Sequence, residues 1–93
     1  MTKKELAKKI LGVIKQRGWT SGELQNSKGQ VCLLGALNQV MRGNPYRSSN
    51  YWWCISNLEK GFINAFEPTP MEFNDTQGEK AVMKRLNEIV KGI

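Results

Sequence analysis

Cysteine, carboxylate and amide side chains are the groups in this sequence whose types could support chemistry. Cys32 stands where a helix is expected to start, and a helix N-terminus lowers the pKa of a thiol. The chain contains no histidine, so no imidazole base can activate that thiol. We therefore predict that Cys32 and Cys54 are buried free thiols, and we assign no catalytic residue.

Metal and cofactor sites are disfavoured by the same composition. Two cysteines without histidine cannot complete a tetrahedral zinc site. No loop of the GxxxxGK[ST] type is present to hold a nucleoside triphosphate. Asn74 and Asp75 offer side-chain oxygens, but at an expected helix start such residues usually cap backbone amides. We predict no metal, no cofactor and no enzymatic activity.

Apolar residues recur at helical spacing in four segments, which predicts four helices. We expect these helices over residues 2–17, 31–41, 51–66 and 76–93. Thr2 with Glu5 and Thr76 with Glu79 match the capping box and mark two of the starts. Short connections and the absence of a linker predict a mainly α, compact four-helix single domain over residues 1–93. A short β-ribbon between the first two helices remains an open alternative.

The densest apolar run, residues 31–41, is predicted to be the core helix. Gly35, Asn38 and Gln39 fall on the side of this helix opposite its apolar face. In the first helix, Leu11 falls in the outward row of lysines. Trp19 is expected to pack just past the glycine that ends this helix. Residues 71–73 are expected to close over the core as an apolar flap before the last helix begins.

Fourteen basic against eight acidic residues give a net charge of +6, which permits binding to nucleic acid. Lysines recur along the outer faces of the first and last helices. They are Lys4, Lys8, Lys15, Lys80, Lys84 and Lys91. If the two helices lie side by side, these lysines could neutralise several phosphates. A nucleic-acid-binding accessory protein is therefore one functional hypothesis, although solvated helix faces carry the same pattern.

The segment from Tyr46 to Trp53 combines aromatic and basic residues and is the preferred contact surface. Tyrosine, tryptophan and arginine dominate the energetics of protein interfaces. Tyr46 and Arg47 fall in the expected loop, and Trp53 falls off the apolar face of the third helix. We predict partner binding through Tyr46, Arg47 and Trp53, and the same surface would also serve a homodimer.

Three short motifs together resemble those of small bacterial and phage proteins classed as a domain of unknown function. The motifs are Gly18-Trp19-Thr20, Cys32-Leu33-Leu34-Gly35-Ala36-Leu37 and Phe73-Asn74-Asp75. The resemblance implies no activity, substrate or catalytic residue. It implies a setting, because compact proteins of phages and mobile elements often act by contacting a host factor.

These observations favour a non-catalytic binding protein of phage or mobile-element type that blocks or sequesters a host component. The component would be a host protein or ribonucleoprotein, for example of a defence system, which is the mode of an anti-CRISPR inhibitor. No apolar run is long enough to span a membrane, so we expect the protein in the bacterial cytoplasm. A third hypothesis is an enzyme or small-ligand sponge with a pocket near Trp19 and Asn74.

Overall fold

The computed structural model describes residues 2–43, 57–67 and 69–92. Within these ranges the chain forms four helices: α1 (Lys3–Arg17), α2 (Leu33–Arg42), α3 (Asn57–Ile63) and α4 (Pro70–Lys91). The prediction of a mainly α, four-helix fold is confirmed. Each described helix is too short or too polar to cross a lipid bilayer.

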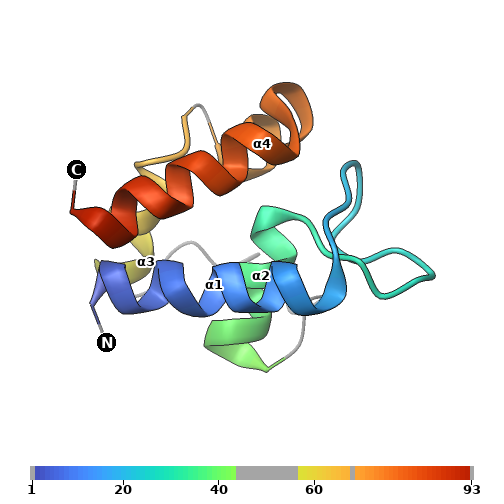
Figure 1. Ribbon diagram of the computed structural model, residues 1–93, viewed down its shortest axis with the longest axis horizontal. Helices are drawn as coiled ribbons and strands as arrows, with labels where there is room; N and C mark the ends of the chain where they lie inside the picture. The colour runs from blue at the N-terminus through green and yellow to red at the C-terminus, as the bar shows by residue number, and fades with distance from the viewer. Residues whose placement is uncertain (1, 44–56, 68, 93) are drawn as a thin grey trace.

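Helices α1 and α4 lie side by side and run in opposite directions, so the start of α1 and the end of α4 lie at the same end of the molecule (Figure 1). Helix α1 also packs against α2 and, near its start, against α3. Because neighbours surround α1 on several sides, its buried arc is wider than a single stripe. Leu11 is only 6% exposed, so its predicted place in the outward lysine row was wrong.

The predicted start of α1 is confirmed in atomic detail. The backbone N–H of Glu5 donates to Thr2 Oγ1 at 3.1 Å, and the backbone N–H of Thr2 donates to Glu5 Oε1 at 3.4 Å. This reciprocal pair is a capping box, which satisfies amides that have no partner inside the helix. The helix ends at Gly18, whose φ of 91° favours glycine over residues with a side chain.

Helix α2 begins two residues later than predicted, because Val31 pairs with extended backbone. Val31 forms isolated β-bridges with Trp19 and Gln25, which are the described remnant of the ribbon that the sequence left open. Gly35 and Asn38 are buried, so their predicted place on an outer face was wrong. For Gly35 the reason is tertiary, because the loop backbone at Leu24 lies against it. Asn38 accepts a hydrogen bond at 3.2 Å from Arg42 of the same helix, and Arg42 in turn donates to Glu59 of α3 at 2.8 Å.

Helix α3 is described from Asn57 to Ile63, whereas residues 51–56 of the predicted third helix lie outside the described residues. After α3 the chain turns and buries Phe66 completely. The Phe66 ring lies 5.1 Å from that of Phe62 and 5.2 Å from that of Phe73, centroid to centroid. This aromatic cluster joins α3 to the beginning of α4.

Helix α4 begins at Pro70, six residues before the predicted start. The Thr69 side chain accepts from the Glu72 amide at 3.1 Å, and proline suits the first helical turn. The predicted flap of residues 71–73 was therefore wrong, because these residues form that first turn. The predicted capping box at Thr76 was also wrong: its hydroxyl donates to the Glu72 carbonyl. Gly78, at φ 87° and ψ 176°, instead kinks the helix nearby.

Candidate functional site

Helix α1 carries most of the net charge of this protein. It contains six basic residues and one acidic residue, so its net charge is +5 out of +6 for the whole chain. Lys4, Lys8 and Lys15 are exposed and share about 40° of the helix circumference at 3.6 residues per turn. Gly12 lies beside this row, one turn after Lys8, and has open space around it. The exposed side of α1 is therefore a basic surface.

Helix α4 has a different charge pattern. Lys80, Lys84 and Lys91 are exposed, as predicted. The helix as a whole, however, contains four acidic and four basic residues. Its lysine row is therefore accompanied by carboxylates, and the strongest positive field is expected over α1.

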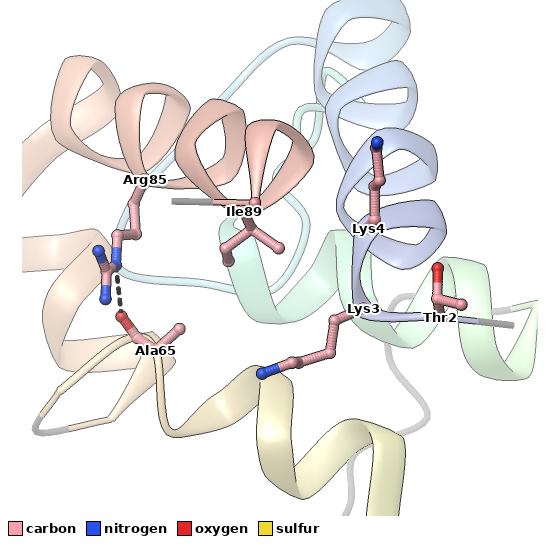
Figure 2. Close-up of a pocket in the computed structure, with 7 residues that line it drawn as sticks. Thr2, Lys3, Lys4, Ala65, Arg85 and Ile89 are labelled. Atoms are coloured by element: carbon pink, nitrogen blue, oxygen red, sulfur yellow. Dashed lines mark hydrogen bonds between the residues drawn. The ribbon is translucent and has the colours of Figure 1, made fainter.

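A cleft of about 460 Å³ lies where the start of α1 meets the end of α4. Its lining residues are Thr2, Lys3, Lys4, Ala65, Arg85, Ile89 and Gly92. In Figure 2 the Lys3 side chain extends from α1 toward α3 and the Arg85 side chain extends from α4 toward Ala65, whereas the Lys4 side chain projects away from Ala65 and Arg85. The cleft therefore has two cationic walls from segments at opposite ends of the chain.

Arg85 is held in place at the edge of the cleft. Its Nε donates to the backbone carbonyl of Ala65 at 3.0 Å. Its Nη1 lies 3.7 Å from Glu88 Oε1, and both side chains are partly exposed, so that ion pair is weak. Sequence reasoning missed Lys3 and Arg85 as a pair. No local pattern could reveal it, because only the antiparallel packing of the terminal helices brings them together.

Asn74 is completely buried and forms a junction rather than a ligand site. Its Oδ1 accepts from Trp19 Nε1 at 2.7 Å and from the Leu33 amide at 2.9 Å. Its Nδ2 donates to the Thr20 carbonyl at 3.1 Å and to Asp75 Oδ1 at 3.0 Å. These four bonds use the full hydrogen-bonding capacity of an asparagine side chain. Asn74 therefore has no hydrogen-bonding position left for a ligand in the hypothetical pocket near Trp19 and Asn74.

Cys32 is a buried free thiol, as predicted, with 3% of its surface exposed. Its Sγ accepts from the Gly35 amide at 3.3 Å and so caps the start of α2. Burial raises the pKa of the Cys32 thiol above the ordinary value of 9.0, and the nearby charge of Asp75 acts in the same direction. The thiol is therefore protonated at neutral pH, unlike the thiolate of a reactive cysteine.

The remaining predicted site residues, Tyr46, Arg47 and Trp53, lie outside the described residues, as does Cys54. Their assignment stays a prediction. Among the residues that the structure does describe, no three histidine, cysteine or acidic side chains form a group able to hold a metal ion.

A family model described as "Family of unknown function (DUF6197)" matches residues 1–89. The chain belongs to the DUF6197 family. Membership of DUF6197 confirms the predicted resemblance to a domain of unknown function, and the match includes Lys3, Arg85 and Ile89 of the basic cleft. No curated protein and no solved structure matches this DUF6197 chain.

Proposed function

We propose that this protein is a non-catalytic binding protein that contacts nucleic acid through the exposed face of α1. The observation that carries the proposal is the concentration of charge, since α1 holds a net +5 and exposes Lys4, Lys8 and Lys15 in one row. A non-catalytic role is favoured because the chain has no histidine and Cys32 is buried with a raised pKa.

The geometry of the lysine row suits a phosphate backbone. From Lys4 to Lys15 the row is about 16 Å long at 1.5 Å per residue. One strand of B-form DNA carries about five phosphates over that length. Gly12, exposed beside the row, has no side chain that could read a base edge. The contact is therefore with phosphates and largely independent of sequence.

Fluorescence anisotropy with a labelled 20-base duplex and a single strand, each at 50, 100 and 200 mM NaCl, tests this proposal. If three lysines contact phosphates, log K should fall with log salt with a slope of about −2.7, at about 0.9 per contact. The triple variant Lys4→Gln, Lys8→Gln, Lys15→Gln should lose most of the binding and most of the slope. Glutamine keeps the helix propensity of lysine, so the helix is preserved.

A matched control removes the same charge from α4, through Lys80→Gln, Lys84→Gln and Lys91→Gln. Because acidic residues accompany that row, its loss should weaken binding much less than loss of the α1 row. Equal losses in the two triple variants would contradict the assignment to α1. Absence of wild-type binding at 50 mM NaCl would remove the proposed function altogether.

The second candidate is a phage or mobile-element protein that blocks a host component in the bacterial cytoplasm through Tyr46, Arg47 and Trp53. Its support is the aromatic and basic composition of that segment. A pull-down from bacterial lysate, performed with and without nuclease, distinguishes the two candidates. A nuclease-resistant host protein that is lost when the three residues become alanine would support the second, and loss of all captured material on nuclease treatment would support the first.

A further inference from the structure

We infer that the cleft between the start of α1 and the end of α4 holds one phosphate of the bound nucleic acid, between Lys3 and Arg85. This inference rests on the proposed function and adds to it a defined anchoring point. Lys3 is adjacent in sequence to Lys4, the first lysine of the α1 row. The cleft therefore adjoins the N-terminal end of the row, and a strand reaches it by bending around the start of α1 from the Lys4 side (Figure 2).

Arg85 has the geometry of a prepared phosphate ligand. The bond from Nε to the Ala65 carbonyl, at 3.0 Å, orients the guanidinium plane. Among the described residues, the two Nη groups make no hydrogen bond, and Glu88 Oε1 lies 3.7 Å from Nη1. The Nη donors are thus available to phosphate oxygens, which the planar guanidinium binds in a bidentate manner. Its orientation also lowers the conformational entropy lost on binding.

Lys3 supplies the second positive charge from the opposite wall. Its Cδ atom lies 3.5 Å from the position that a Cβ atom on Gly61 would occupy, so the side-chain stem runs along α3. Within the described part of the chain, no carboxylate pairs with Lys3. The acidic residue at this end of α1, Glu5, is engaged with Thr2 in the capping box. Lys3 therefore retains its charge for a ligand.

The remaining lining of the cleft favours a phosphate attached to an organic group. Ile89 and the Ala65 side chain provide apolar surface beside the two cations. The volume of about 460 Å³ lies within the range of small-molecule sites. Apolar walls exclude water from one side of the cations and strengthen their attraction for an anion. A phosphodiester can place its phosphate against the two cations and its sugar against the apolar surface.

The test compares two double variants in the same anisotropy titrations with the labelled 20-base duplex. Lys3→Gln with Arg85→Gln removes the cleft cations, and Lys9→Gln with Arg17→Gln removes one lysine and one arginine elsewhere on α1. The cleft variant should bind at least tenfold more weakly at 100 mM NaCl and reduce the salt slope by about 0.9, the value for one lost phosphate contact. The control variant should lose less than threefold.

Arg85→Lys keeps the charge but removes the planar donor pair, so it should bind several-fold more weakly than the wild type. Thermal melting of each variant confirms that it is folded at the titration temperature. If an Arg85 variant is not folded, the single variant Lys3→Gln is titrated in its place. Wild-type binding with equal losses in the cleft and control variants would overturn this inference alone. A wild type that binds neither duplex nor single strand would overturn both this inference and the proposed function.

Discussion

The indole nitrogen of Trp19 donates to Oδ1 of Asn74 at 2.7 Å, although 55 positions separate the two residues in the chain. The same oxygen accepts from the Leu33 amide, the first of helix α2. One buried side chain thus joins the segment after α1, the start of α2 and the first turns of α4. All three motifs that carried the resemblance are therefore held together directly.

Replacement of Asn74 by alanine should lower the free energy of unfolding by about 3 kcal/mol. The change leaves the Trp19 indole and the Leu33 amide without their acceptor, at about 1–3 kcal/mol for each unsatisfied donor. Urea denaturation followed by circular dichroism measures the loss. Asn87→Ala on the exposed side of α4 is the control, and it should change stability by no more than about 0.5 kcal/mol. Similar effects in the two variants would argue against the junction.

Two glycines in helices should respond oppositely to alanine. A Cβ atom on Gly35 would overlap the backbone carbonyl of Leu24, so Gly35→Ala should displace the loop and cost about 3 kcal/mol or more. Gly12 has open space around it in α1, so Gly12→Ala should raise stability by about 0.5–1 kcal/mol through helix propensity. Melting temperatures of the two variants give the comparison, and a tolerated Gly35→Ala would contradict the close approach of the loop.

The ion pair between Arg42 and Glu59 should be sensitive to loss of one partner. Their side chains are 2.8 Å apart and only 19% and 6% exposed. Arg42→Met should cost about 3 kcal/mol, because it leaves the Glu59 carboxylate buried without this partner. The double variant with Glu59→Gln should cost less than the sum of the single changes in urea denaturation. Lys60→Met, at an exposed neighbouring site, is the control, and strict additivity would contradict the coupling.

The thiol of Cys32 should make stability depend on alkaline pH. Burial raises its pKa above 9.0, so the folded protein retains a proton that the unfolded chain loses. The stabilising contribution is complete below pH 9.0 and decreases as the pH rises through the folded-state pKa, by at most about 1.4 kcal/mol per pH unit.

Urea denaturation between pH 7.5 and 10 measures this effect in a Cys54→Ser background, where Cys32 is the single thiol. Cys32→Ser in the same background is the control, since serine keeps a capping oxygen and does not titrate in this range. The thiol protein should lose stability faster than the serine protein above pH 9.0. Iodoacetamide should also modify native Cys32 slowly, and parallel pH curves or rapid modification would contradict its burial.

Local signals predicted the parts of the fold that depend on neighbours in sequence. The capping box of Thr2 and Glu5 formed where it was expected, and α1 ends at Gly18. The same signal failed at Thr76 because a second start lies just upstream, at Thr69 and Pro70. The earlier start places Phe73 in the first turns of α4, against Phe66. Packing of the aromatic cluster thus accompanies the earlier start, and the helix that begins there is kinked at Gly78.

The sequence by itself determined the absence of imidazole chemistry, the basic charge of α1 and its helical period, because these depend on residue types and on spacing within one turn. Only the tertiary structure decided that Leu11, Gly35 and Asn38 are buried and that Lys3 faces the same cleft as Arg85. Each of these outcomes requires contact between segments far apart in the chain. Such contacts depend on how whole helices pack together, which no single stretch of sequence encodes.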